Sequence, residues 1–296
     1  MSGQPMATVW RRLAAELAAA GLDSPQAEAR LLVAHVMDLP LNRLAALEQL
    51  PDQAVAALDR LVARRRAGEP LQHLTGQAWF RTVQLAVGPG VFLPRPETEV
   101  MVGWALDRLR AQLADGAAPI VVELCAGSGA ISAALAAEAP GCRQWAVERA
   151  ASALVYLRRN LAASEVVVVA GDMADALPEL DHQVDLVLAN PPYVPTGRRP
   201  DLPATVRDFD PPEALYAGPD GLDASRVVAQ TAGRLLRAGG QVASEHDDDQ
   251  GRSVPALFVA AGFGAVADQV DLTGRSRFVT ATWDGRPDTM GAGAGR

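Results

Sequence analysis

The sequence comprises 296 residues with a formal net charge of -8 at pH 7, a length that allows one large domain or a small domain beside a large one. All 27 of its Lys and Arg residues are arginine, which excludes Schiff-base chemistry, a lysine general base and the lysine-dependent phosphate loop. The acidic balance argues against non-specific binding of nucleic acid, because such binding rests on cationic contacts to phosphates.

The cysteines and the hydropathy pattern bear on the compartment. Cys125 and Cys142 favour a reducing compartment over a disulfide framework. No apolar run approaches the roughly 18 residues of a membrane span, and the N-terminus has no basic segment followed by an apolar one. We therefore expect a cytoplasmic protein with no membrane partner.

Residues 1–69 predict a small helical bundle with no strand in it. Helical spacing of apolar residues occurs in three segments, 9–22, 23–39 and 51–70. In the second segment Ser24 and Pro25 predict the helix start, and Glu28 is placed to complete a capping box. The run Arg64–Arg66 is either a docking patch or a solvated last helical turn that complements the helix dipole, and the second interpretation is favoured.

The rest of the sequence predicts a β-hairpin linker over 70–97 and an α/β domain over 98–283. Polar and apolar residues alternate in the linker between glycines and prolines. After Pro119, apolar strand candidates alternate with helices, which predicts a Rossmann-like, doubly wound parallel sheet. The strand candidates are 119–125, 143–148, 166–172, 184–190 and 241–246, and the helical stretches are 130–139, 150–162 and 224–237. Two more strands within 264–283 predict an antiparallel addition at one edge, and 284–296 predicts a disordered tail.

Three acids at successive strand ends predict a cofactor site, because ligands of open parallel sheets bind at the carboxyl ends of the strands. Glu123 ends the first strand, Glu148 the second and Asp172 the third. A carboxylate at Glu148 suits two ribose hydroxyls, and one at Asp172 suits an adenine amino group. Gly127 and Gly129 let the first loop approach a ligand closely; an ordinary glycine turn is the alternative.

The pattern favours S-adenosylmethionine over a dinucleotide cofactor. The third glycine of a G-x-G-x-x-G loop would fall at Ser132, and Glu123 would repel a pyrophosphate. S-adenosylmethionine carries an ammonium and a sulfonium group, so an acid is favourable there. We therefore expect S-adenosylmethionine, with S-adenosylhomocysteine as its product, and no metal site.

The four residues after the fourth strand, Asn190, Pro191, Pro192 and Tyr193, predict the catalytic and substrate-binding residues. A planar amide or exocyclic amine nitrogen is a poor nucleophile with two N–H groups, which two fixed acceptors can hold. The side-chain oxygen of Asn190 and a backbone carbonyl such as that of Pro191 would supply them, because proline presets the backbone. The Tyr193 ring can pack on the flat amide or amine group of the substrate, and its face can attract the positively charged sulfonium group of the cofactor. A proline strand terminator before a core tyrosine is the alternative.

Together these segments resemble the class I, S-adenosylmethionine-dependent methyltransferases of the HemK/PrmC family, which methylate the side-chain amide of glutamine. The resemblance covers roughly residues 8–283, and its main segments are "VFLPRPETE" (91–99), "ELCAGSGAIS" (123–132), "NPPYVP" (190–195) and "DPPEALYAGPDGL" (210–222). It implies that the substrate is the glutamine of the Gly-Gly-Gln loop in class 1 peptide chain release factors. We expect the helical domain and the hairpin to hold this partner.

The resemblance also implies site residues. It places the cofactor on Cys125, Ala126, Gly127, Ser128, Gly129, Glu148, Asp172, Met173 and Asn190, beside Glu123, and the substrate glutamine on Asn190 to Tyr193. Pro94, Arg95 and Glu97 either line the cofactor edge or have a structural role. Cys125 departs from the family pattern, which usually has a glycine there, and Met173 replaces a frequent aromatic residue.

Two other functions are compatible with parts of the pattern. The same chemistry serves methylation of a ribosomal-protein glutamine or of an adenine or cytosine amino group. A nucleic-acid enzyme should have a basic cleft and a target-recognition region, and this acidic chain has no large insertion. A non-catalytic cofactor-binding module would not be expected to keep Asn190 and Tyr193 with all three acids. We expect a monomer without direct nucleic-acid binding.

Overall fold

The computed structural model describes residues 3–285 and divides them into two compact units. The first contains residues 3–77 and the segment Pro203–Phe209, and the second contains the rest. Of the tail predicted over 284–296, all but Asp284 and Gly285 lies outside the described residues. No helix in the described part of the chain is long and apolar enough to cross a membrane.

The first unit has the helical core that its periodicity predicts. Its main helices are α1 (Met6–Ala19), α2 (Pro25–Met37) and α3 (Asp52–Arg66), followed by the short α4 (Leu71–Thr75). A 3-10 helix, η1 (Leu41–Ala46), links α2 to α3, and the short α8 (Ala204–Arg207) lies in the returning segment. Leu13, Leu17, Leu32 and Leu58 are fully buried between the helices. Burial of leucines at helical spacing is therefore the main source of stability here.

A short ladder in the first unit was not expected, and the prediction of an uninterrupted helical bundle is wrong at this point. β1 (Gly3–Pro5) pairs antiparallel with β2 (Gln49–Pro51). Each strand has three residues and leads directly into a helix, α1 or α3. Three residues are too few to display an alternating pattern, so the sequence contained no strand signal.

The capping box predicted at the start of α2 is also wrong. Ser24 makes no side-chain cap hydrogen bond, and the Glu28 carboxylate instead accepts two hydrogen bonds from the Arg65 guanidinium of α3, at 2.6 and 3.0 Å. Arg65 is only 11% exposed, so it is not part of a solvated helical turn. Arg64 pairs with Glu69 at 2.5 Å. Glu28 lies four residues after Ser24, whereas a capping box needs the acid three residues on, so the carboxylate forms this bidentate pair between two helices instead.

The β-hairpin expected in the linker is confirmed. β3 (Gln77–Phe80) pairs with β4 (Val83–Ala86), and Phe80 and Leu85 are each 1% exposed. Arg81 lies at the turn with a φ of 50°, and its guanidinium binds the Glu138 carboxylate of α6 (Ala130–Glu138) at 2.7 and 2.8 Å. This ion pair and the two buried side chains attach the hairpin to the second unit.

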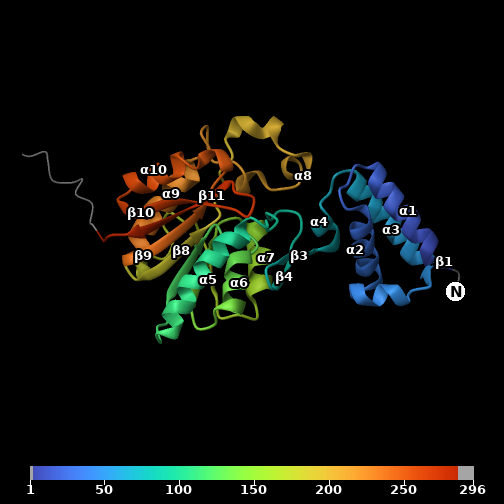
Figure 1. The fold of residues 1–296 in the computed structure, drawn as a ribbon, viewed down its shortest axis with the longest axis horizontal. Helices are drawn as coiled ribbons and strands as arrows, with labels where there is room; N and C mark the ends of the chain where they lie inside the picture. Colours follow the sequence, from blue (N-terminus) through green and yellow to red (C-terminus); the bar gives the residue numbers. More distant parts are fainter. Residues whose placement is uncertain (1–2, 286–296) are drawn as a thin grey trace, which may run out of the picture. The chain divides into compact units, whose positions relative to one another are not determined.

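The second unit is built on a sheet of order β10-β11-β9-β8-β5-β6-β7 (Figure 1). The strands are β5 (Ile120–Leu124), β6 (Arg143–Glu148), β7 (Val167–Ala170), β8 (Val184–Ala189), β9 (Leu236–Glu245), β10 (Phe263–Val270) and β11 (Ser276–Trp283). The pairs among β5 to β9 are parallel, whereas β10 and β11 are antiparallel. Both the parallel sheet and its antiparallel edge were predicted.

Helices cover both faces of this sheet, as Figure 1 shows. One face packs against α5 (Thr98–Ala114), α6 and α7 (Ala151–Leu161), and the other against α9 (Asp223–Leu235) and α10 (Ser253–Ala260). Within β5, Val121 packs toward α5 and α6, and Val122 and Leu124 pack on the opposite face. The strand is apolar on both faces because both are covered.

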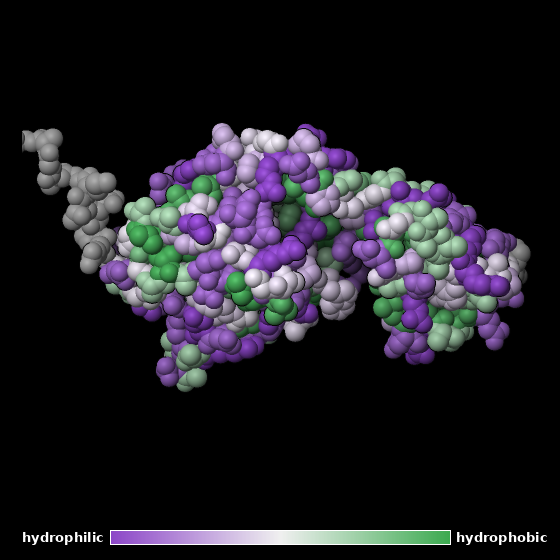
Figure 2. Space-filling view, turned by 45° about the horizontal axis from the view of Figure 1, so that its top comes forward, coloured by the Kyte–Doolittle hydropathy of each residue, from purple (hydrophilic) through white to green (hydrophobic). Residues whose placement is uncertain are grey.

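Short 3-10 helices connect the elements of the second unit. They are η2 (Pro178–Leu180), η3 (Thr196–Asp201), η4 (Pro212–Ala214) and η5 (Asp248–Gln250). On the visible face of each unit, polar residues are interspersed with small groups of apolar ones (Figure 2). The exposed large apolar residues of the described chain, among them Trp79, Val155 and Leu272, come from separate elements.

The Glu28–Arg65 pair generates a first prediction. Glu28→Ala removes two of the three hydrogen bonds of the mostly buried Arg65 guanidinium and should lower the free energy of unfolding by about 2 kcal/mol. Glu16→Ala is the control, because Glu16 is 31% exposed in an i,i+4 pair with Arg12, which predicts a loss of about 0.5 kcal/mol or less. Urea unfolding of the full chain, followed by far-UV circular dichroism, measures both; equal losses would contradict the prediction.

Candidate active site

The loop between β5 and α6 turns through three residues in the left-handed region. Cys125, Gly127 and Gly129 have φ angles of 56°, 55° and 81°. Cys125 therefore keeps the backbone conformation for which glycine is the usual choice, at a cost of about 1 kcal/mol. A Cβ on Gly129 would lie 2.6 Å from Leu157 Cδ1, whereas one on Gly127 would meet no atom within 4 Å. Gly129 thus permits close packing on α7, and Gly127 leaves open space for a ligand.

Glu123 is buried beneath this loop at 3% exposure. Its Oε2 accepts hydrogen bonds from the Ser132 backbone N–H at 2.9 Å and from the Ser132 hydroxyl. Burial raises the pKa of this carboxyl to about 8, against the lowering effect of Ser132. Ser132, which stands where a dinucleotide loop would have its third glycine, is therefore a partner of the acid.

Glu148 connects the loop to the end of β6. Its Oε2 accepts from the Gly127 N–H at 2.8 Å, and its Oε1 accepts from the backbone N–H groups of Arg149 and Ala150 at 2.8 and 2.7 Å. Three backbone donors hold the carboxylate in place at 9% exposure. The acid that was expected to bind ribose also shapes the glycine loop.

Asp172 and Met173 follow β7 on the same edge of the sheet. Asp172 accepts from the Ala174 N–H at 3.0 Å and from the Arg149 guanidinium at 3.2 Å, and the backbone bond with Ala174 holds the pKa of Asp172 below its usual range. The Met173 sulfur lies 3.4 Å from the Cys125 sulfur. The loops after β5, β6 and β7 thus meet through side chains that the sequence had singled out.

Burial disfavours the thiolate form of both cysteines. Burial raises the pKa of the Cys125 thiol to about 12 and that of Cys142 to about 11. The thiolate is the reactive form, so neither is placed as a nucleophile at neutral pH. The described residues also contain no group of three or more His, Cys, Asp or Glu that could hold a metal.

Asn190 follows β8 directly and lies beside the glycine loop, because Ala189 pairs with Leu124 in the parallel register. Its side-chain Nδ2 donates to the Thr98 hydroxyl at 3.1 Å, and this hydroxyl donates to Glu245 Oε2 at 2.6 Å. Neither Thr98 nor Glu245 was among the predicted site residues. The only available signal was their position, Thr98 within "PRPETE" and Glu245 at the end of the fifth strand.

The backbone after Asn190 is held in place by hydrogen bonds with other segments of the chain. Gln250 Nε2 donates to the Tyr193 carbonyl at 3.0 Å, and Val194 exchanges backbone hydrogen bonds with Leu215 and Ala217 at 2.8 and 3.0 Å. A Cβ on Gly221 would lie 2.4 Å from the Tyr193 carbonyl oxygen, so glycine is required for this approach. Pro191 is buried, and Pro192 and Tyr193 are half-buried. Burial raises the pKa of the Tyr193 hydroxyl, which therefore stays protonated.

The segment "DPPE" (210–213) has a structural role. Asp210 is 4% exposed, and its Oδ2 binds the Arg95 guanidinium at 2.5 Å. The Arg95 guanidinium also lies 4.7 Å from the centre of the Phe92 ring. These contacts give Arg95 a structural partner in the second unit. The link joins "PRPETE" to "DPPE", two segments 115 residues apart that the sequence did not connect.

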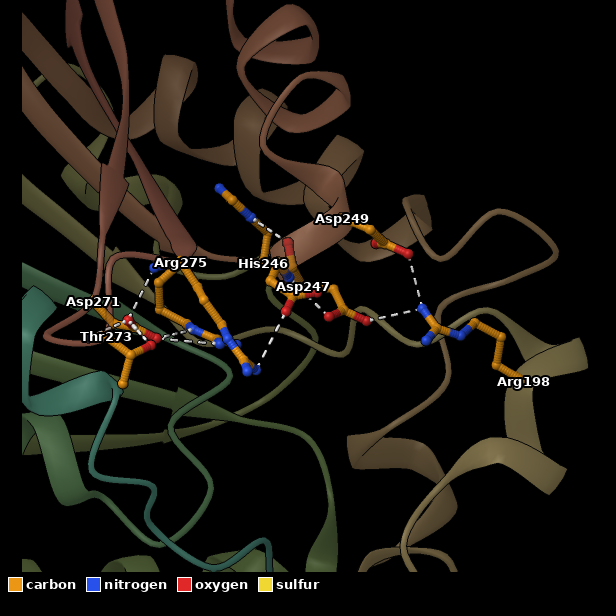
Figure 3. Close-up of polar contacts among 9 residues, drawn as sticks. Arg198, His246, Asp247, Asp249, Asp271, Thr273 and Arg275 are labelled. Carbon is orange, nitrogen blue, oxygen red and sulfur yellow. Dashed lines mark hydrogen bonds and ion pairs between the residues drawn. The ribbon is translucent and has the colours of Figure 1, made fainter.

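Ion pairs connect the loop after β9 to the loop after β10, where Arg275 lies 3.7 Å from Asp248, and to η3 (Figure 3). Arg198 binds Asp247 and Asp249 at 3.4 and 2.9 Å. Asp271, before β11, accepts from the Thr273 hydroxyl at 2.6 Å and its N–H at 2.8 Å, and mainly this side-chain hydrogen bond lowers the pKa of Asp271 to about 2. Arg277 lies 3.3 Å from the same carboxylate. This network holds the sheet edge that borders Glu245.

The sheet order, the glycine loop and an asparagine amide at the end of β8 define a class I methyltransferase. Residues 104–202 match the methyltransferase small domain, and residues 8–76 match the PrmC N-terminal domain. Among solved structures, the hMettl16 catalytic domain has a TM-score of 0.53 and 15% identity, covering 69% of this chain and 77% of that one. This likeness concerns the fold alone.

Comparison with relatives of similar sequence identifies the family more narrowly than the fold does. The release factor glutamine methyltransferase of Streptomyces coelicolor is 48% identical over 267 residues, covering 90% of this chain and 93% of the relative. That of Mycobacterium tuberculosis is 42% identical over 275 residues, covering 90% and 88%. A 4-amino-L-phenylalanine/4-methylamino-L-phenylalanine methyltransferase of Streptomyces pristinaespiralis is 40% identical over 250 residues, covering 83% and 85%. The chain belongs to the family of release factor glutamine methyltransferases.

The two glycines of the loop generate a second prediction. Gly129→Ala should lower the free energy of unfolding by about 3 kcal/mol, because left-handed strain adds to a clash with Leu157. Gly127→Ala meets no neighbour and should cost about 1 kcal/mol from strain alone. Thermal unfolding of both variants compares them, and a Gly127→Ala variant as unstable as Gly129→Ala would contradict this account.

Proposed function

We propose that this chain transfers a methyl group from S-adenosylmethionine to the side-chain amide nitrogen of the glutamine in the Gly-Gly-Gln motif of class 1 peptide chain release factors. The observation that supports it most is Asn190, whose amide nitrogen is bound within the protein at Thr98. The side-chain oxygen is left as an acceptor for a planar NH₂ group. Family membership supports the substrate.

The residues after β8 act on the acceptor group. Asn190 Oδ1 and the Pro191 carbonyl accept its two N–H groups and fix its nitrogen for in-line attack, which is catalysis by orientation. Tyr193, held through its carbonyl by Gln250, packs against the flat group. No strong general base is required, because the proton becomes acidic once the nitrogen has begun to form its new bond.

The residues after β5, β6 and β7 form the proposed cofactor site. S-adenosylmethionine, when bound, supplies an electrophilic methyl group. The open space over Gly127 and the carboxylates of Glu148 and Asp172 suit its polar groups, and the uncharged Met173 side chain suits a flat adenine. The buried Glu123 carboxyl favours a positive charge nearby. These residues therefore fit the charged groups of this cofactor.

We assign the docking of the release factor to the helical unit and the hairpin. The match of residues 8–76 to the PrmC N-terminal domain supports this assignment. The reaction then takes place in the cytoplasm, where free cysteines persist, with the enzyme as a monomer and without direct contact to nucleic acid.

A second candidate substrate follows from one relative. The Streptomyces pristinaespiralis enzyme is named for 4-amino-L-phenylalanine and its methylamino derivative. An aromatic amine resembles an amide, since its nitrogen is also planar and carries two N–H groups. Asn190 and Pro191 suit both, so these residues do not separate the two substrates, and the assay includes both.

The substrate experiment uses purified protein, isotope-labelled S-adenosylmethionine and unmodified release factor, followed by peptide mass mapping. One added methyl on the Gly-Gly-Gln glutamine is the expected result. Label on 4-amino-L-phenylalanine, a ribosomal protein or a nucleic acid, with none on the release factor, would keep the chemistry and overturn the substrate.

A third prediction concerns Asn190. Asn190→Ala should lower turnover at least a hundredfold, because the acceptor nitrogen loses one of its two fixed partners, while S-adenosylmethionine affinity stays within a few-fold. Gln112→Ala is the control, because it truncates a half-buried amide side chain near the end of α5, outside both the site and the proposed docking unit. Turnover and calorimetric binding are measured on both; a parallel loss of binding in Asn190→Ala would show that Asn190 acts mainly on the cofactor.

A further inference from the structure

Three buried groups from separate segments form a hydrogen-bonded chain behind Asn190. Thr98 begins α5 and is 4% exposed, and Glu245 ends β9 and is 1% exposed. Asn190 donates to the Thr98 hydroxyl at 3.1 Å, and the hydroxyl donates to Glu245 at 2.6 Å. The Asn190 nitrogen is thus bound to Thr98 inside the protein, and the side-chain oxygen of Asn190 is left for a ligand.

The direction of this chain follows from what each group can donate. An ionised carboxylate only accepts, so the single hydroxyl proton of Thr98 is given to Glu245. Toward Asn190 the hydroxyl oxygen can then only accept, which requires the NH₂ side of the amide to face it. The Asn190 oxygen is thereby turned outward. Glu245, two hydrogen bonds away, determines which end of the amide is presented.

We propose that Glu245 and Thr98 are positioning residues that hold the Asn190 amide with its oxygen toward the acceptor NH₂ group. This inference rests on the proposed function for its catalytic meaning, and the orientation itself is independent of the substrate. If the Asn190 amide were reversed, its NH₂ group would face the NH₂ group of the substrate. The hydrogen bond from the substrate nitrogen to the Asn190 oxygen would then be lost.

Charge around Glu245 makes the orientation depend on pH. The groups that face this carboxyl are Arg277 on β11, Glu97 before α5 and Tyr193 after β8, with Thr98 as its hydrogen-bond partner and the Asn190 amide beside Thr98. Burial raises the pKa of Glu245 to about 7, while Thr98 and Arg277 oppose this rise. Once protonated, Glu245 donates to Thr98, which frees the Thr98 proton for the Asn190 oxygen and reverses the chain.

The sign of the pH dependence follows. The working orientation needs the ionised carboxylate, so turnover is full well above pH 7, half-maximal near the pKa of Glu245 at about 7, and lower still below it. Glu245→Gln removes this ionisation, so the decrease of kcat toward low pH, measured with saturating S-adenosylmethionine, should disappear, and kcat should be constant at a lower value.

The first test reads the Asn190 amide without any substrate. The chain has only three asparagines, Asn42, Asn160 and Asn190, so selective ¹⁵N-asparagine labelling gives three side-chain NH₂ pairs. The Asn190 pair is identified by its loss in Asn190→Ala. It should shift with a midpoint near pH 7 in the wild type and stay constant in Glu245→Gln. An unchanged titration in Glu245→Gln, or none in the wild type, would overturn the proposal.

The second test reads turnover on the release factor. Thr98→Val keeps the shape and loses the hydroxyl, and should lower kcat about tenfold or more with little change in the KM for S-adenosylmethionine. Thr98→Ser keeps the hydroxyl and should restore kcat to within about threefold of the wild type. Thr280→Val is the control for the loss of a buried hydroxyl, because Thr280 is buried on β11 and has no hydrogen bond to Asn190, Thr98 or Glu245 among those described.

The outcomes separate the two proposals. A Thr98→Ser variant as slow as Thr98→Val, or a Thr98→Val variant as active as the wild type, would overturn the positioning role. A wild type that methylates no release factor but shows the Asn190 titration would overturn the proposed substrate and leave the positioning role intact.

Discussion

The parallel register of β5 with its two neighbours decides where the polar residues of the site lie. Leu124 pairs with Val147 of β6 on one side and with Ala189 of β8 on the other. The residues that follow these positions must therefore emerge together at one edge of the sheet. This juxtaposition does not require the loops to be rigid, because apolar burial on both sheet faces holds the strands in place.

Much of this was predictable because the sequence signals were local. Strands of four to six apolar residues and helices with regular spacing predicted the sheet and the helical core. The three acids and Asn190 were predictable from a rule of topology, since parallel strands end at a common edge. Glu148 ends β6, whereas Glu123 lies one residue before the end of β5 and Asp172 two residues after the end of β7. Each also has protein partners that no strand pattern could reveal.

The contacts that were missed connect residues distant in sequence. Glu28 was expected to form a capping box with Ser24, but it lies four residues on instead of three, and a guanidinium 37 residues away binds it in a bidentate pair. Arg95 with Asp210, and Glu245 with Thr98 and Asn190, likewise join segments whose proximity exists only in the folded chain. The short pairing of β1 with β2 could not be predicted for a different reason, because three residues are too few to show the alternation of polar and apolar side chains that marks a strand.

The buried Glu123 makes ligand binding a proton-coupled event. With its pKa near 8, this carboxyl is mostly protonated at neutral pH. A cationic ligand placed beside it favours the ionised form and displaces the proton into the solvent. The measured heat of binding will then include the heat with which the buffer takes up that proton, so enthalpies from phosphate and from Tris solutions will differ although the contacts are the same.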